Sequence, residues 1–147
     1  MKAYTHGGDI LTAKMGFQGE IVDFSANLNP LGMPESVRRA AAAAVKGAVH
    51  YPDPLCRMLT EGIARRDGVK REWVLCGNGA ADLIFRLAFA LRPKRALVTA
   101  PTFSEYQEAM EAAGSEVVYH RLTPDNDFNL TDAVLEDLDG RLEMAFF

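Results

Sequence analysis

The stretch 74–91, Val-Leu-Cys-Gly-Asn-Gly-Ala-Ala-Asp-Leu-Ile-Phe-Arg-Leu-Ala-Phe-Ala-Leu, decides the fold of this chain. A short apolar run enters a Gly-Asn-Gly turn, and a helical pattern with one continuous apolar face leaves it. The glycines lack Cβ atoms and allow positive φ, so a ligand can approach the backbone closely. Ala80 and Ala81 then place unpaired N–H groups at the start of the helix, where its dipole favours an anion. The stretch predicts a phosphate-binding turn between a strand and a helix, and it equally allows a tight turn capped at Asn78 without a ligand.

Downstream of this stretch, the sequence alternates between strands and helices. The run 95–100 is almost continuously apolar, which is typical of a strand covered on both faces. We expect the following elements after it: a helix from the turn at 101–106 to Gly114, a strand at 116–120, a short helix at 131–138 and a strand at 142–147. This spacing predicts an α/β fold, in which a mostly parallel sheet carries helices on both faces and right-handed crossovers join the strands.

The residues upstream follow a different pattern. Residues 1–32 are rich in glycine, asparagine and proline, so we expect an irregular amino-terminal arm. A helix is predicted from Pro34 to Lys46, with its apolar stripe buried. A second helix is predicted to begin at Pro54 with Asp53 as its cap and Gly68 at its end. The residues expected to face inward from these two helices are Val37, Ala40, Ala41, Ala44 and Val45 in the first, and Leu55, Met58, Leu59 and Ile63 in the second. The chain is thus predicted to have three parts, 1–32, 33–72 and 73–147.

Composition excludes several classes of function. With 48% hydrophobic and 24% charged residues, the 147-residue chain has the composition of a globular protein with a real core. The net charge of -4 gives no basic surface for nucleic acid, and no apolar stretch is long enough to span a membrane. The first residues lack the apolar core of a signal peptide, and Cys56 and Cys76 lack metal-ligand spacing. We therefore expect a cytoplasmic protein with reduced cysteines.

Five short motifs occur in an order that points to one group of enzymes. They are His-Gly-Gly-Asp at 6–9, Asp-Phe-Ser-Ala-Asn-Leu-Asn-Pro-Leu-Gly at 23–32, His-Tyr-Pro-Asp-Pro at 50–54, Gly-Asn-Gly-Ala at 77–80 and Pro-Thr-Phe-Ser-Glu-Tyr at 101–106. The series resembles the amino-terminal part of fold-type I pyridoxal-phosphate enzymes, over the whole chain. Within that group it most resembles the threonine-phosphate decarboxylases of cobalamin biosynthesis, and the histidinol-phosphate aminotransferases, which share the later motifs, are near relatives.

The resemblance implies roles for particular residues. In the cofactor site, backbone N–H groups of Gly79, Ala80 and Ala81 hold the phosphate of pyridoxal 5'-phosphate, and Phe103 stacks on its pyridine ring. Tyr51 matches a tyrosine that reaches the cofactor phosphate of the partner subunit. In the substrate site, the matching residues are His6, Gly7 and Gly8 in an arm that closes on the substrate's phosphate, and Asn27. Each assignment has a plainer alternative, such as helix-start packing for the alanines, a core position for Phe103, and a solvated position for His6.

The resemblance also implies a reaction and a partner. The substrate is expected to be a small phosphorylated amino acid or amine, and in the decarboxylases L-threonine O-3-phosphate becomes aminopropanol phosphate. The lysines of this chain are Lys2, Lys14, Lys46, Lys70 and Lys94, and all precede the region where the family carries its Schiff-base lysine. We therefore expect no activity from these 147 residues alone. In the family's sheet, later strands lie between 74–76 and the other three strands. We therefore expect 95–100, 116–120 and 142–147 to pair together and 74–76 to lose its neighbours. Unpaired strand edges promote swapping, so we also expect a homodimer or a swapped oligomer.

Two functions of other classes remain open. One is a parallel-sheet module that binds a phosphorylated ligand at the 77–81 turn without chemistry. The other is a structural or dimerisation module, because the amino-terminal segments of the family help to form its dimer.

Overall fold

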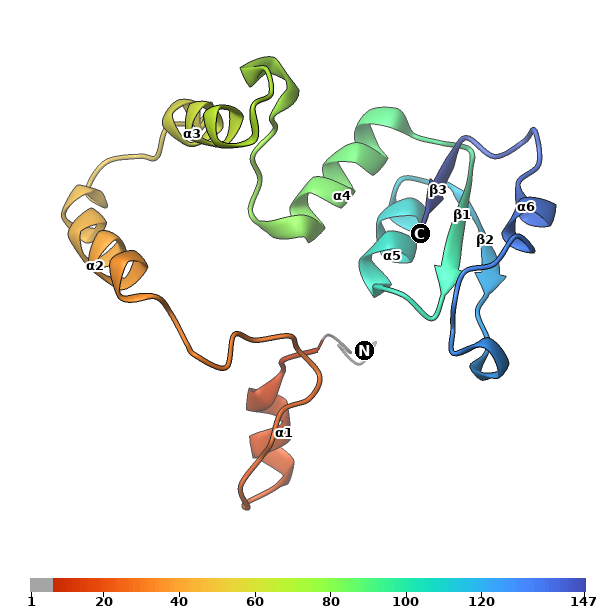
Figure 1. The fold of residues 1–147 in the computed structure, drawn as a ribbon, viewed down its shortest axis with the longest axis horizontal. Helices are drawn as coiled ribbons and strands as arrows, with labels where there is room; N and C mark the ends of the chain where they lie inside the picture. The colour runs from red at the N-terminus through yellow and green to blue at the C-terminus, as the bar shows by residue number, and fades with distance from the viewer. Residues whose placement is uncertain (1–6) are drawn as a thin grey trace. The chain divides into compact units, whose positions relative to one another are not determined.

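The chain folds as two compact units, one ending at Cys56 and the other beginning at Arg57. The computed structural model describes residues 7–147, which are drawn in colour in Figure 1. Each unit has its own set of contacts and is described by itself. Among residues 7–147, no helix has the length and apolar character needed to cross a membrane.

The second unit is built on a parallel sheet of three strands. They are β1 (Arg95–Ala100), β2 (Glu116–Arg121) and β3 (Met144–Phe146), in the spatial order β2-β1-β3. Both pairs are parallel, with Ala96 beside Val117 on one side and beside Met144 on the other. The central strand is the most apolar, which is expected for a strand that has neighbours at both edges and helices on both faces. The predicted parallel α/β sheet is confirmed.

One face of this sheet is covered by two long helices. These are α4 (Gly79–Leu91) and α5 (Ser104–Ala112), which pack against each other and against the strands. The core beneath them is formed by the buried side chains of Ile84, Ala88, Ala96, Ala109 and Met110. Ile84 and Ala88 lie one turn apart on α4, so the apolar face expected from the sequence is the face that meets the sheet.

The opposite face is covered by the short helix α6 (Val134–Asp137). Side chains alternate between the faces of a strand, so Thr99 points away from Ala96, and its neighbour His120 points away from Val117. His120 is buried, and its Nδ1 lies 2.7 Å from Oδ2 of Asp137 in α6. Helices therefore lie on both faces of the sheet, as predicted (Figure 1).

The segment that leads into α4 differs from its prediction. Val74 has extended backbone angles, φ -110 and ψ 121, yet residues 74–76 pair with no strand of the described chain. A strand needs a ladder partner for its backbone groups, and apolar sequence alone does not supply one. No strand forms at 74–76, so that assignment is wrong, whereas the expected pairing of the other three strands without it is confirmed. Its contact with the preceding helix is polar, because Thr60 Oγ1 lies 3.6 Å from Cys76 Sγ.

Helix α3 (Arg57–Asp67) opens the second unit, followed by a single turn of 3-10 helix, η2 (Arg71–Trp73). Gly68 ends α3 with a φ of +67, and the N–H of Val69 reaches the carbonyl of Ala64, so the predicted C-cap is confirmed. The predicted start at Pro54 is wrong, because the side chain of Asp53 accepts a hydrogen bond from the N–H of Leu55 in a turn before the helix.

The predicted inward faces of two helices are wrong for most of their residues. In α3 the buried residues are Thr60 and Ala64, and the predicted Ile63 is half-buried, whereas Met58 is 91% exposed. Leu55 and Leu59 are exposed too. Helix α2 (Glu35–Ala44) and the 3-10 turn η1 (Val45–Gly47) occupy the predicted helix at 34–46, but none of their residues is buried. An apolar stripe shows which face of a helix favours burial, but the covering surface must come from elsewhere.

The first unit also contains a helix that was not predicted, α1 (Ile10–Gly16). Asp9 caps it, because its Oδ1 accepts a hydrogen bond of 3.0 Å from the N–H of Thr12. The expectation that 1–32 is irregular throughout is therefore wrong for residues 10–16. The last short element is η3 (Pro124–Asn126), a 3-10 turn in the loop between β2 and α6.

Candidate functional site

Two of the segments singled out in the sequence lie toward the same edge of the sheet. Helix α4 precedes β1 in the chain and helix α5 follows it, and both begin toward the arrowhead end of β1 (Figure 1). This is the carboxyl edge of the parallel strands, where α/β sheets bind their ligands. The Gly-Asn-Gly turn before α4 and the turn at 101–103 before α5 therefore form one candidate site.

The start of α4 presents a set of unused N–H donors. Gly79 has a φ of +83, and nothing lies within 4 Å of the position that a Cβ would take there. The N–H groups of Gly79, Ala80 and Ala81 have no hydrogen-bond acceptor among residues 7–147. Gly79 and Ala80 are exposed and Ala81 is half-buried, so a ligand can reach them. Three free donors at a helix start, together with the helix dipole, suit a phosphate group.

A carboxylate that the sequence reasoning missed shapes this turn. Oδ2 of Asp82 accepts a hydrogen bond of 2.8 Å from the N–H of Asn78, and Oδ1 accepts one of 2.9 Å from Nε of Arg86. The bond from Asn78, then the bond from Arg86, lower the pKa of the Asp82 carboxyl. Asn78 precedes the helix, but its side chain makes no capping hydrogen bond. The Asp82 carboxylate instead accepts the backbone N–H of the turn, at Asn78. The spacing of four residues between Asn78, Asp82 and Arg86 was the available signal.

Gly77 is required by the position of that carboxylate. A Cβ at Gly77 would lie 2.7 Å from Oδ2 of Asp82 and 2.7 Å from Cδ2 of Leu83. Distances this short require the side chains of Asp82 and Leu83 to shift, whereas glycine lets them fold back over the turn in place. The two glycines thus differ in role, because Gly77 makes room for the protein's own side chains and Gly79 leaves its space open.

Phe103 stands at the start of α5, as its N-cap residue. Its side chain is 37% exposed, and its ring meets the ring of Tyr106 edge to face, with centroids 5.8 Å apart and planes at 83°. Tyr106 in turn stacks on Phe146 of β3, at 4.6 Å and 17°. The site therefore combines the free amides of α4 with a half-exposed aromatic ring that is supported from behind.

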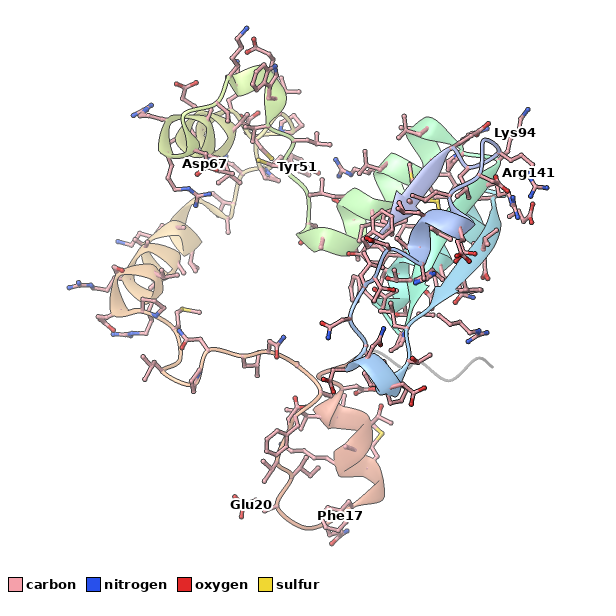
Figure 2. The ribbon with its side chains drawn as sticks, turned by 45° about the vertical axis from the view of Figure 1, so that its right-hand side comes forward. Phe17, Glu20, Tyr51, Asp67, Lys94 and Arg141 are labelled. Carbon is pink, nitrogen blue, oxygen red and sulfur yellow. The ribbon has the colours of Figure 1, made fainter. Side chains whose placement is uncertain are left out.

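The other predicted site residues belong to the first unit. The side chain of Tyr51 is fully exposed, as labelled in Figure 2, and Asn27 is exposed in the loop that follows Ser25. His6 lies outside the described residues. Gly8 donates its N–H to Oγ of Ser25 at 2.7 Å, and Gly7 lies so close to the Ser25 carbonyl that a Cβ there would collide. The structure brings the two arm glycines together with the 23–25 loop.

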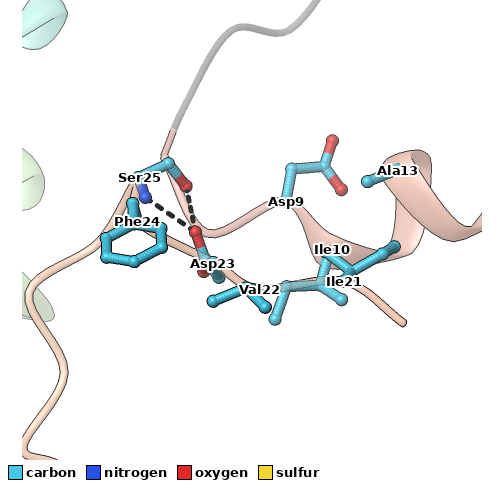
Figure 3. Close-up of a pocket in the computed structure, with 8 residues that line it drawn as sticks. All are labelled: Asp9, Ile10, Ala13, Ile21, Val22, Asp23, Phe24 and Ser25. Carbon is cyan, nitrogen blue, oxygen red and sulfur yellow. Dashed lines mark hydrogen bonds between the residues drawn. The ribbon is translucent and has the colours of Figure 1, made fainter. Parts of the chain in front are cut away.

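Beside that loop lies a cavity of about 200 Å³ (Figure 3). Oδ1 of Asp23 accepts hydrogen bonds from the hydroxyl and the N–H of Ser25, which lower the pKa of the Asp23 carboxyl, and Oδ2 is buried without a partner. Asp9 also contributes to the lining, and hydrogen bonds from Thr12 lower its pKa. Two ionised carboxylates suit a hydrogen-bond donor or a cation, and they disfavour a phosphate.

The lysines within the described residues are Lys14, Lys46, Lys70 and Lys94. Lys94 precedes β1 at the amino edge of the sheet, and Lys70 places its Nζ 5.5 Å from the centre of the Trp73 ring. Lys14 and Lys46 belong to the first unit. Among the described residues, no group of three or more histidine, cysteine, aspartate or glutamate side chains could hold a metal ion.

Comparison with known proteins places this arrangement in context. The chain is 40% identical to the threonine-phosphate decarboxylase of Salmonella typhimurium over 144 residues, which are 96% of this chain and 40% of that protein. It is 37% identical to histidinol-phosphate aminotransferase 1 of Cupriavidus pinatubonensis over 100 residues, which are 67% of this chain and 27% of that protein. The chain thus spans less than half of the length of these curated relatives.

The fold and a family model agree with these similarities. The crystal structure of an aspartate aminotransferase from Thermotoga maritima superimposes with a TM-score of 0.72 and 25% identity, covering 91% of this chain and 39% of that one. The family model described as aminotransferase class I and II matches residues 19–145, which include the α4 turn, the α5 turn, strands β1 and β2 and the start of β3. With the parallel sheet and its carboxyl-edge site, this match shows that the chain belongs to the aminotransferase class I and II family.

Proposed function

We propose that this chain is the amino-terminal part of an enzyme that decarboxylates L-threonine O-3-phosphate to aminopropanol phosphate, for cobalamin biosynthesis. The observation that carries the proposal is the extent of the likeness to the Salmonella threonine-phosphate decarboxylase, which runs over 96% of the chain. The likeness to the histidinol-phosphate aminotransferase covers 67% of the chain. A relative that matches the arm as well as the sheet is the better guide to the substrate.

Pyridoxal phosphate is the cofactor of this family, and the candidate site fits two of its parts. The phosphate is matched by the N–H groups of Gly79, Ala80 and Ala81, above which the space at Gly79 is open. The pyridine ring is matched by the half-exposed ring of Phe103 at the same edge of the sheet. When bound, the cofactor supplies an electron sink for the electron pair that is released when a substrate bond breaks.

The charges around the turn are arranged to leave only those three amides for the anion. Asp82 takes the N–H of Asn78 for itself, and Arg86 neutralises the Asp82 carboxylate from the solvent side of α4. Arg86 compensates the negative charge of Asp82, which would otherwise repel an anion bound at the start of α4. The Asp82–Arg86 pair therefore fixes the turn at little electrostatic cost to phosphate binding.

The first unit would supply the contacts to the substrate. We assign His6, Gly7, Gly8 and Asn27 to this role on the resemblance, with Gly7 and Gly8 held against Ser25. Contacts that hold the substrate's Cα–carboxylate bond perpendicular to the plane of the cofactor ring favour loss of carbon dioxide over loss of a proton. The cavity beside Asp23, with its two carboxylates, suits hydrogen-bond donors of a ligand.

The assembly and location of the enzyme are also part of the proposal. We infer a cytoplasmic homodimer, in which the exposed ring of Tyr51 reaches the cofactor phosphate of the partner subunit. Because all lysines of this chain precede the region where the resemblance places the Schiff-base lysine, the 147 residues alone are proposed to be inactive.

A second candidate is a histidinol-phosphate aminotransferase, which the 37% identity over 100 residues favours. One experiment separates the two. The protein encoded by the whole reading frame that contains these codons is purified and loaded with pyridoxal phosphate. It is then assayed with L-threonine O-3-phosphate for release of carbon dioxide, and with histidinol phosphate and 2-oxoglutarate for amino transfer. Carbon dioxide release supports the decarboxylase, and amino transfer without it overturns the proposal.

A further inference from the structure

We propose that Tyr106 is a positioning residue, which with Phe146 behind it sets the orientation of the Phe103 ring against the cofactor. This inference rests on the proposed function, because it takes the cofactor ring as the partner of Phe103. It extends that function by giving roles to two aromatic residues that would otherwise count only as packing.

The first observation is the way in which Phe103 and Tyr106 are joined. The two residues lie one helical turn apart, and the N–H of Tyr106 approaches the carbonyl of Phe103 at 3.3 Å. Their rings meet edge to face, with centroids 5.8 Å apart and planes at 83°. Aromatic pairs prefer this arrangement, because the positive edge of one ring faces the negative face of the other. The contact therefore restrains the angle of the Phe103 ring as well as its distance.

The second observation is that Tyr106 is itself anchored from two sides. Its ring stacks on Phe146 of β3, at 4.6 Å and 17°, so helix α5 is tied to a strand 40 residues away in sequence. Tyr106 and Phe146 also pack against the buried core that includes Ala109 and Met110. Phe103, in contrast, keeps 37% of its surface exposed. The core of the sheet thus holds the Tyr106 ring in place, and the Tyr106 ring in turn restrains the exposed ring of Phe103.

The consequence for binding follows from side-chain entropy. A half-exposed phenylalanine without a neighbour can occupy several rotamers, and a ligand that stacks on it must first select one of them. A supporting ring that fixes the rotamer in advance improves affinity without touching the ligand. Loss of Tyr106 should therefore weaken cofactor binding roughly two- to tenfold, which is the range spanned by an aromatic pair.

The first test needs no cofactor. A fluorinated phenylalanine is placed at position 103 of the 147-residue chain, and its ¹⁹F resonance is recorded for the parent, Tyr106→Phe, Tyr106→Leu and Phe146→Leu. The parent and Tyr106→Phe should share one shifted resonance, because both keep a ring beneath position 103. Tyr106→Leu should move the signal toward that of the unfolded chain, and Phe146→Leu should move it part of the way. An unchanged signal in folded Tyr106→Leu overturns the proposal.

The second test separates positioning from general stability. Cofactor dissociation constants are measured by absorbance for the protein of the whole reading frame, in a double-mutant cycle with Phe103→Leu. Tyr106→Leu should weaken binding in the parent and have no further effect once Phe103 is replaced. An equal effect in both backgrounds shows that Tyr106 acts on stability alone and overturns the proposal. If the parent binds no cofactor, the proposed function fails, whereas the ¹⁹F result still decides whether Tyr106 orders Phe103.

Should Tyr106→Leu fail to fold, the decision passes to Phe146→Leu. This variant keeps both members of the edge-to-face pair and removes only the stacked support. It should shift the fluorine signal and weaken cofactor binding in the same direction as Tyr106→Leu. A parent-like signal and affinity in Phe146→Leu contradict the proposal that Phe146 supports Tyr106 in orienting the Phe103 ring.

Discussion

Replacing Gly77 by alanine tests the geometry on which the phosphate turn depends. The new Cβ would lie 2.7 Å from Oδ2 of Asp82 and 2.7 Å from Cδ2 of Leu83, whereas ordinary contacts begin near 3.4 Å. A retreat of the carboxylate by about 0.7 Å would carry its distance from the Asn78 nitrogen from 2.8 Å past the usual hydrogen-bond range. We expect the hydrogen bond to be lost, at a total cost of about 1–3 kcal/mol, which is usual for a methyl group forced against packed neighbours.

Two measurements report on this change. Urea unfolding followed by far-UV circular dichroism gives the free energy of unfolding, and amide hydrogen exchange gives the protection of the Asn78 N–H. The matched control is Gly62→Ala in α3, where a Cβ meets nothing within 4 Å. That control should stabilise the chain by about 0.5–1 kcal/mol, because alanine favours a helix interior over glycine. If Gly77→Ala unfolds like the parent and keeps the Asn78 N–H protected, the hydrogen bond from Asn78 to Asp82 does not depend on glycine at position 77, and the reasoning is refuted.

Three further outcomes are expected. Hydrogen bonds from Arg141 chiefly hold the pKa of the Asp139 carboxyl at about 2, below its usual 3.8, so the stability it contributes is present above pH 3.8 and lost as the pH falls toward 2. Asp139→Asn should therefore flatten the acid side of a plot of urea midpoint against pH. Leu97→Ala should cost about 2–5 kcal/mol in urea unfolding, because Leu97 is fully buried, whereas Leu135→Ala on the exposed face of α6 should change stability by less than about 0.5 kcal/mol. Ala80→Pro removes one amide donor from the first turn of α4, so it should weaken pyridoxal-phosphate binding in an absorbance titration, while Ala80→Ser should bind as the parent does.

The parts of the fold that were predictable are those whose partners lie close in sequence. The strand at 95–100 was predicted at its observed bounds, because an unbroken apolar run between two helices has few other structures open to it. Helix α4 followed from its apolar face, and that face meets the sheet through Ile84 and Ala88. In both cases the elements that cover the strand or the helix come from residues 79–147 themselves, so the side chains that favour burial are buried.

The errors share one physical cause. Residues 74–76 have no strand partner in the described chain, and most of the apolar residues predicted to face inward from α2 and α3 stay exposed. Hydrophobic periodicity is a property of a segment, whereas burial is a property of a segment and its neighbour. Helix α1 was missed for the opposite reason, because its seven residues are too few for a clear period and its cap at Asp9 is the stronger signal.

Within the candidate site, the backbone was easier to predict than the side chains around it. The Gly-Asn-Gly turn and the helix start at Ala80 followed from the absence of Cβ atoms and the presence of free donors. Asp82 was read as part of a helix, although its spacing from Asn78 marks a carboxylate that can fold back on the turn. Tyr106 was passed over in the same way, because a single sequence does not show that its ring leans on Phe103 and on a strand 40 residues later.

The contacts at the candidate site indicate that binding of the cofactor's phosphate and its covalent attachment to a lysine are separable in the family. The amides of α4 are set by contacts within residues 77–86, so they need nothing beyond the turn and its helix. The ring of Phe103 needs one long-range support, Phe146, which the sheet supplies. Attachment through a lysine needs an amine at the carboxyl edge, but Lys94 lies at the opposite edge and Lys70 at Trp73.

The second unit should therefore bind the cofactor's phosphate and ring reversibly. Borohydride treatment should trap no specific adduct on either lysine, and a stable adduct at one of them would contradict this separation.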